Sequence, residues 1–259
     1  MEGLNQKIQA VLAKYSCRSG IVIINLSNGT RLELHPEMVF PAASMIKVPI
    51  MIEVMRQAAA GTLSLDQMFE ITDDVKTEGA GILKELRSGA PMTVRELVTL
   101  MIILSDNTAT NVLINLVGMN AINTTVTGLG LRSTVLQRKM MDFAAAKAGK
   151  ENYTSAADLA QLFAAIANNN LPIPLQYNEL MLDILKRQQV RDKLPFYLPE
   201  EIIIAHKTGT LPGAEHDAGI LFVPGGPYII CVLTADLAAN YEGLQLVASI
   251  GKNIYDYIS

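Results

Sequence analysis

"FPAASMIKVPIMIEVM", residues 40–55, places a serine and a lysine near the start of an apolar stretch. From Ala43 onward, apolar residues recur at steps of three and four positions, which predicts a helix. Ser44 and Lys47 are three positions apart, and residues at this spacing lie on one face of a helix. We therefore expect Ser44 in the first turn, with Lys47 one turn above it on the same side.

Strand patterns lie towards the two ends of the chain, on either side of a helical middle. Residues 19–36, "SGIVIINLSNGTRLELHP", are typical of a hairpin around an Asn-Gly turn, and three short apolar runs suited to strands lie within residues 201–237. Helical patterns occupy residues 4–15, 155–168, 177–190 and 241–257 as well as a long stretch of the middle, where Thr93 and Glu96 have the spacing of a capping box.

This order of elements predicts an α/β (α+β) fold. The simplest arrangement is an antiparallel sheet that is built from both ends of the chain and flanked by helices, with an all-helical domain inserted. We expect the sheet domain to comprise residues 1–38 and 193–259, and the helical domain to comprise residues 39–192.

Composition excludes several classes of protein. The formal net charge of -4 gives no basic surface for nucleic acid, and the longest fully apolar runs, such as "LMIIL" at 100–104, are far too short to cross a bilayer. The N-terminus is typical of an amphipathic helix and not of a signal peptide. We expect a cytoplasmic monomer, or an exported protein if a leader precedes this sequence, with a small molecule as its substrate and no membrane partner.

The two cysteines, Cys17 and Cys231, form no cluster of metal-ligand type, so we expect no metal and no cofactor. Both are expected to be small buried residues, and a disulfide between them is the alternative.

Three short motifs carry chemical groups in a fixed order. Ser44-Met45-Ile46-Lys47 comes first, and a second Ser-x-x-Lys, at Ser249 and Lys252, is expected on the surface of the C-terminal helix. Ser105-Asp106-Asn107 lies at the junction of two predicted helices. Lys207-Thr208-Gly209-Thr210 lies at the end of a predicted strand, and neither of these two motifs recurs.

This ordered set resembles that of class A β-lactamases and penicillin-binding proteins. The resemblance extends along most of the chain. Beyond residues 40–55, the stretches that carry it are "MTVRELVTLMIILSDNTATNVLINLVG" (92–118), "AHKTGT" (205–210) and "DAGILFVPGGPYIICVLTADL" (217–237). It implies a serine hydrolase that forms an acyl-enzyme with a β-lactam or an acyl-D-amino acid substrate.

The residue types in these motifs suit the formation of an acyl-enzyme. A serine hydroxyl is a weak nucleophile that needs a base beside it, and no histidine is placed by a motif to serve Ser44. Lys47 is the candidate base, which requires that it be neutral. Burial near a second cation, Lys207, lowers the pKa of a lysine in the required direction.

The resemblance implies the remaining roles. Ser105 would pass a proton to the leaving nitrogen, and Asn107 would hydrogen-bond the acyl-side amide of the substrate. Thr208 and Thr210 would bind its carboxylate, with added charge from Lys207. The backbone N–H groups of Ser44 and Thr210 would form the oxyanion hole.

The chain departs from the family pattern in "STVLQRKMMDFAAAKAGKENYTS", residues 133–155. Class A enzymes carry an Arg-x-Glu pattern here, and its glutamate activates the water that removes the acyl group. Aligned on Thr134, Arg138 and Thr154, the glutamate position holds Met140, whose thioether cannot accept a proton at neutral pH. Asp142, which a shift of two residues would bring into that position, and Glu151 are possible substitutes.

A second departure is the run Gly79-Ala80-Gly81, where many class A enzymes carry a bulky aromatic residue. This run predicts an open mouth suited to a larger or flatter substrate. Three functions stay open: a β-lactam hydrolase with slow or non-standard deacylation, a D-alanyl peptidase or esterase on another acyl substrate, and a penicillin-sensing module that stays acylated.

Overall fold

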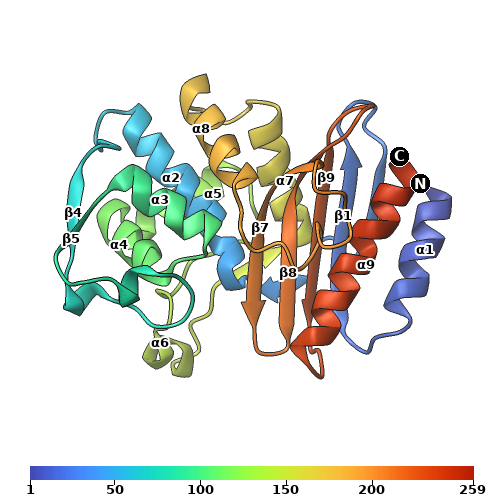
Figure 1. Ribbon diagram of the computed structural model, residues 1–259, viewed down its shortest axis with the longest axis horizontal. Coiled ribbons are helices and arrows are strands. Elements are labelled where there is room, and N and C mark those ends of the chain that lie inside the picture. The colour runs from blue at the N-terminus through green and yellow to red at the C-terminus, as the bar shows by residue number, and fades with distance from the viewer.

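A five-stranded antiparallel sheet forms one half of the protein, and both ends of the chain contribute to it (Figure 1). The structure, a computed structural model, describes residues 1–259. The strand order β2-β1-β9-β8-β7 confirms the sheet that the sequence predicts. Its strands are β1 (Arg18–Asn25), β2 (Arg31–Leu34), β7 (Ile203–Leu211), β8 (Ala214–Phe222) and β9 (Tyr228–Ala235).

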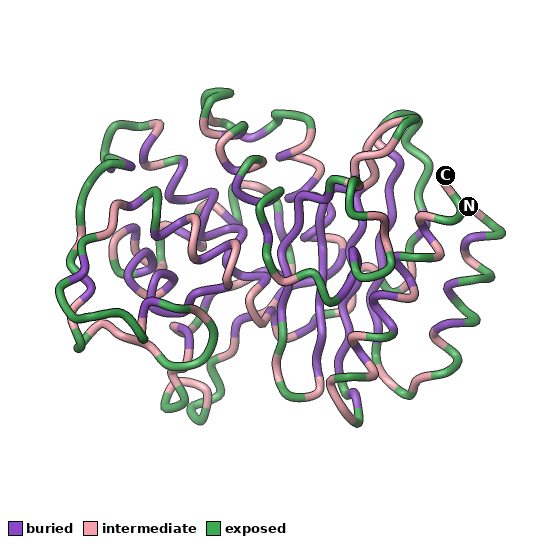
Figure 2. Tube along the Cα trace, in the orientation of Figure 1, coloured by how far each residue is buried: buried purple, intermediate pink, exposed green.

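Both faces of this sheet are covered, which explains the continuous apolar run in β1. Ile21 and Ile23 belong to a hydrophobic cluster shared with α1 (Glu2–Leu12) and α9 (Asn240–Ile258). The alternate residues of β1 point to the other face, where α7 (Ala156–Ala167) packs. Figure 2 shows the buried positions concentrated along the strands and the helices beside them.

The remaining helices gather beside the sheet, on the left in Figure 1. Although α7 lies in the range that we assign to the helical domain, it packs on the sheet, and the proposed domain boundaries stay a prediction. The helices are α2 (Lys47–Ala59), α3 (Val94–Ile103), α4 (Asn107–Val117), α5 (Met119–Gly128), α6 (Phe143–Lys147) and α8 (Leu175–Lys186), and two small ladders pair β3 (Val39–Pro41) with β6 (Tyr153–Ser155) and β4 (Met68–Ile71) with β5 (Ala90–Thr93).

The helix expected from Ala43 starts differently from the prediction. A 3₁₀ turn, η1 (Ala43–Ile46), comes first, and α2 begins at Lys47. Pro49 is one reason, because it has no N–H to bond the carbonyl of Met45 four residues earlier. The predicted capping box at the start of α3 is confirmed, since Thr93 and Glu96 each bond the other's backbone N–H.

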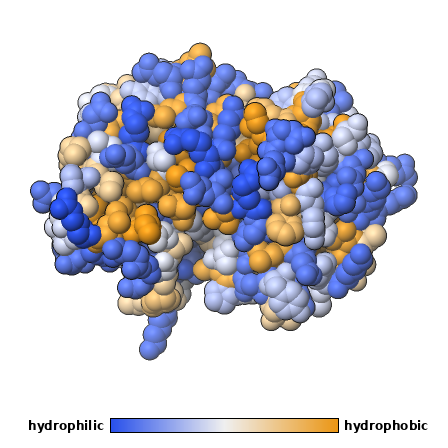
Figure 3. All heavy atoms as spheres, in the orientation of Figure 1, coloured by the Kyte–Doolittle hydropathy of each residue, from blue (hydrophilic) through white to orange (hydrophobic).

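Cys17 and Cys231 are free thiols. Cys231 is buried within β9 as expected, whereas Cys17 is only partly buried. No helix combines the length and the apolar character that crossing a membrane requires. No group of three or more histidine, cysteine or acidic side chains is arranged to hold a metal ion. Figure 3 shows hydrophilic side chains over much of the viewed face, with apolar ones between them.

Candidate active site

The link between α3 and α4 presents Ser105 in a left-handed backbone conformation, with φ 56°. Asp106 holds this turn. One of its carboxylate oxygens caps α4 by accepting from the N–H of Ala109, and the other accepts from Ile82 and Leu83. The motif Ser105-Asp106-Asn107 therefore forms the N-terminal cap of α4, and its tight turn fixes the position of Ser105.

Ser105 lies between two fully buried lysines. Lys47 Nζ lies 2.6 Å from the Ser105 carbonyl oxygen, 3.1 Å from Ser105 Oγ and 2.9 Å from Asn107 Oδ1. Lys207 Nζ lies 3.1 Å from the same Ser105 Oγ and 2.7 Å from the Thr208 carbonyl oxygen. The structure thus brings the lysines of the first and third motifs to one hydroxyl of the second.

Burial lowers the pKa of both lysines. Desolvation lowers the pKa of Lys47 from 10.5 to about 7, against a smaller opposing effect of the Asp106 carboxylate. Desolvation also lowers the pKa of Lys207 well below 10.5, and the charges of Lys47 and Lys193 lower it further. A neutral lysine amine is therefore accessible here near neutral pH.

Ser44 lies in η1, directly after a strained residue. Ala43 has φ 46°, which a residue with a side chain rarely adopts. Gly209 on β7 passes close to this turn, because an added Cβ would lie 3.1 Å from the Ala43 Cβ. His216 Nε2 lies 2.8 Å from the Pro41 carbonyl oxygen and anchors the preceding segment to the sheet. The glycine of the third motif thus lets β7 approach the serine.

A cavity of about 590 Å³ opens beside these residues. It is lined from η1, the end of β7, the loop before η3 (Leu83–Glu85) and the segment around α6, which lies near the carboxyl end of β7 in Figure 1. Its lining residues are Ala43, Ser44, Gly79, Ala80, Asn107, Arg138, Met140, Met141, Phe143, Glu151, Asn152, Thr210, Leu211, Pro212 and Asn240.

An ion pair closes the loop that lines one wall. Arg138 Nε and Nη2 each lie 3.0 Å from an oxygen of Glu151. Asn152, which is 2% exposed, accepts from the N–H groups of Gln137 and Arg138 and donates to the Arg138 carbonyl. These contacts fix the loop across its base.

Met140 faces the cavity from this loop. Asn111 clamps its backbone, since Asn111 Oδ1 accepts from the Met140 N–H at 2.8 Å and Asn111 Nδ2 donates to its carbonyl at 3.1 Å. Asp142 caps α6 by accepting from Ala145 and is not among the lining residues. Glu151 lines the cavity, with its carboxylate paired to Arg138.

At the β7 end of the cavity, the predicted residue Thr210 lies in a group with three residues to which sequence reasoning gave no role. Thr210 donates to Glu215, which also contacts Lys193 and Asn240. Thr208 is buried beside Lys207. Neither Lys193 nor Asn240 stands in a motif, and the same holds for Asn111 and Asn152 in the loop, so no local pattern points to them.

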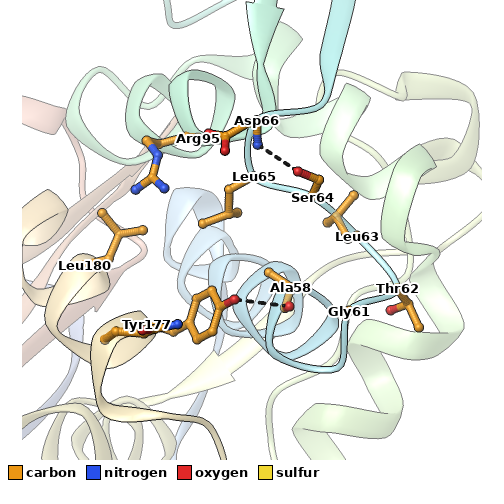
Figure 4. Close-up of a pocket in the computed structure, with 11 residues that line it drawn as sticks. Ala58, Gly61, Thr62, Leu63, Ser64, Leu65, Asp66, Arg95, Tyr177 and Leu180 are labelled. Carbon is orange, nitrogen blue, oxygen red and sulfur yellow. Dashed lines mark hydrogen bonds between the residues drawn. The ribbon is translucent and has the colours of Figure 1, made fainter.

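A second cavity of about 670 Å³ lies apart from these residues, between the end of α2, residues 61–66 and α8 (Figure 4). Tyr177 Oη donates to the Ala58 carbonyl at 3.2 Å across one wall. None of the predicted site residues lines it.

The buried Lys-Ser-Lys cluster and the serine-bearing turn lie on a sheet-and-helix fold of the class A β-lactamase type. The Beta-lactamase enzyme family matches residues 3–258, and the chain belongs to this family. The prediction of the family from the three motifs is therefore confirmed.

Individual relatives of the chain are also β-lactamases. The chain is 24% identical over 276 residues to the β-lactamase VEB-1 of Pseudomonas aeruginosa, which covers 99% of this chain and 90% of the relative. It is 28% identical over 239 residues to a β-lactamase of Streptomyces albus G, with 88% and 76% covered. These relatives indicate a hydrolase.

Solved structures match over almost the whole chain. A β-lactamase from Sphaerobacter thermophilus has 30% identity and a TM-score of 0.90, with 99% of this chain and 96% of that chain covered. PBP-A has 28% identity and a TM-score of 0.89 at the same coverage. A mutant of PBP-A was solved as an acyl-enzyme complex with penicillin G.

Proposed function

We propose that this protein hydrolyses β-lactams through an acyl-enzyme on Ser44, and that it removes the acyl group slowly. Neutral Lys47 takes the proton of the Ser44 hydroxyl as Oγ attacks the lactam carbonyl carbon. The observation that carries the proposal is the contact of Lys47 and Lys207 with the single hydroxyl of Ser105.

Collapse of the tetrahedral intermediate breaks the carbon–nitrogen bond of the lactam. The leaving nitrogen takes the proton of the Ser105 hydroxyl, and the Lys47 ammonium returns a proton to Ser105, from which it lies 3.1 Å. The proton taken from Ser44 thus reaches the leaving group, and Lys47 is neutral again.

The other predicted residues would hold the substrate. Backbone N–H groups of Ser44 and Thr210, both of which line the cavity, form the oxyanion hole of this proposal. Asn107 binds the acyl-side amide. Thr208 and Thr210 contact the leaving-group side, where Lys207 adds positive charge.

Deacylation requires a water molecule to attack the Ser44 ester, and a base to take a proton from that water. The one carboxylate that lines the cavity belongs to Glu151, and Arg138 holds it in a forked ion pair. Met140 occupies the wall where the family glutamate is expected, and a thioether cannot act as a base. Water therefore attacks without a dedicated base, and the acyl-enzyme accumulates.

A fluorescent penicillin tests the nucleophile. We expect covalent labelling of the wild-type protein, located at Ser44 by peptide mass spectrometry, and no labelling of Ser44→Ala. The contacts between Asn152 and Arg138 do not involve Ser44, so the unfolding curve of Ser44→Ala should match that of the wild type. Labelling that persists in Ser44→Ala would remove Ser44 from the mechanism.

One observation favours a second candidate, an acyl substrate other than a β-lactam, such as a D-alanyl peptide or a small ester. Gly79 and Ala80 line the mouth of the cavity, and neither fills it with a large side chain. Release of free acid from D-alanyl peptides or esters faster than from penicillin would favour this candidate. A penicillin label that never leaves would instead indicate a sensing module.

A further inference from the structure

Glu215 lies on β8, opposite Thr210 in the register of the sheet. Its side chain is 2% exposed. Glu215 Oε2 accepts from Thr210 Oγ1 at 2.7 Å and lies 3.2 Å from Lys193 Nζ, while Oε1 accepts from Asn240 Nδ2 at 2.6 Å. A buried carboxylate thus stands directly behind two residues that line the cavity.

Thr210, Glu215, Lys193 and Asn240 form one group, and each hydrogen-bond donor in it already has an acceptor. Thr210 has one hydroxyl proton, and Glu215 accepts it. The side-chain amide of Asn240 donates to Glu215 and to the carbonyl of Leu211. The three protons of the Lys193 ammonium face Glu215, Thr210 and Asp192.

The charge of the group is also balanced. Lys193 is 1% exposed, and its ammonium is paired with the equally buried Glu215. Within this group, a substrate carboxylate would meet neither an unpaired cation nor a free Thr210 proton, and only Lys207 and Thr208 would be left to hold it. The lone pair of Thr210 Oγ1 that is left over can only accept a hydrogen bond.

We propose that Glu215 is a specificity-determining residue that weakens recognition of a free carboxylate on the leaving-group side of the substrate. The cavity beside Thr210 then binds acyl substrates whose carboxylate is masked as an ester or an amide. This inference rests on the proposed acylation of Ser44.

The wild-type protein provides the first test. Acylation rate constants are measured by intact mass spectrometry with benzylpenicillin and with its methyl ester, which differ in the charge at the group that Thr210 faces. We expect the acid to react less than about tenfold faster than the ester, because neither Thr210 nor Lys193 gives the acid a charge-assisted hydrogen bond. A larger preference for the acid would overturn the inference.

Two variants move the ratio in opposite directions. Glu215→Gln frees the Thr210 proton and leaves Lys193 unneutralised, so the acid-to-ester ratio should rise by about tenfold or more, as a hydrogen bond to a charged group provides. Lys193→Met leaves the charge of Glu215 unbalanced, so the ratio should fall. A folding defect slows both substrates alike and leaves the ratio unchanged.

Glu242→Gln is the matched control, because it removes the same charge from the first turn of α9, where Glu242 makes no side-chain hydrogen bond. Its ratio should equal that of the wild type. A ratio that stays constant in Glu215→Gln, or that rises equally in Glu242→Gln, would overturn the role of Glu215 while labelling at Ser44 continues. Absence of acylation by both substrates would reject the proposed function and this inference with it.

Discussion

Lys47 and Lys207 each place the terminal nitrogen 3.1 Å from the hydroxyl oxygen of Ser105. Both lysines are fully buried, and two charged ammonium groups in contact with one buried hydroxyl would repel strongly. Desolvation lowers the pKa of Lys47, and the charge of Lys47 lowers the pKa of Lys207 beyond the effect of burial. A neutral amine is thus available close to the turn that carries Ser44.

The rate of acylation should depend on the protonation of Lys47. The pKa of this lysine is lowered to about 7, so the neutral amine that acts as base becomes the main form as the pH rises through this value. Two pH units below the midpoint about one amine in a hundred is neutral, so acylation by benzylpenicillin should be about a hundredfold slower there. Stopped-flow measurement of acylation from about pH 5 to pH 9 gives the profile.

Lys47→Ala is the matched variant. It should acylate about a hundred to ten thousand times more slowly than the wild type and lose the dependence on pH around 7, because the titrating base is gone. A wild-type rate that is flat across this range would exclude Lys47 as the base.

Turnover should be limited by loss of the acyl group. If Met140 stands in place of the family's base, as we propose, penicillin hydrolysis should show a burst of about one equivalent followed by a slow steady state. In Met140→Glu, the backbone clamp from Asn111 aims a carboxylate at the cavity, and the steady-state rate should rise by about tenfold or more.

Asp142→Asn is the control for that experiment, because Asp142 caps α6 and does not line the cavity. It should leave the slow phase unchanged. Fast turnover by the wild type without a burst, together with its loss in Asp142→Asn, would show that Asp142 is the base and that the loop alignment is wrong.

Gly81 should tolerate no side chain. Its φ of 110° is unfavourable for other residues, and an added Cβ would overlap the Asp106 carboxylate. We expect Gly81→Ala to lower the free energy of unfolding in urea by about 3 kcal/mol or more, since strain and overlap add. Gly149→Ala is the control, because φ is 80° there but no atom lies within 4 Å, and about 1–2 kcal/mol is expected. Equal losses in the two variants would contradict this account.

Asn152 should be important for the cavity-lining loop. Asn152→Ala removes three hydrogen bonds to the backbone of Gln137 and Arg138 and leaves those groups without partners. A loss of about 2–4 kcal/mol in the free energy of unfolding is expected. Asn28→Ala, in the exposed turn between β1 and β2, should cost less than about 1 kcal/mol. A loss in Asn152→Ala no larger than that of Asn28→Ala would mean that the loop is held by the Arg138 ion pair alone.

Local patterns in the sequence predicted most of the secondary structure. The capping box of Thr93 and Glu96, the hairpin around Asn28-Gly29 and the strand runs near the C-terminus depend on neighbours within a few positions, so a pattern can reveal them. The start of α2 was less predictable, because the change from the 3₁₀ turn to α-helix at Lys47 depends on the missing N–H of Pro49 and on packing against β7.

The sequence by itself determined the fold class, the family and the chemical groups of the three motifs, because each of these is written in residues that lie close together in the chain. The tertiary structure decided which distant groups meet. Convergence of Lys47 and Lys207 on Ser105, closure of the loop by Arg138 and Glu151, and the pairing of Glu215 with Lys193 all join residues from different elements. Such contacts leave no local pattern, because the burial and distance that set their energies arise only when the sheet and the helices pack together.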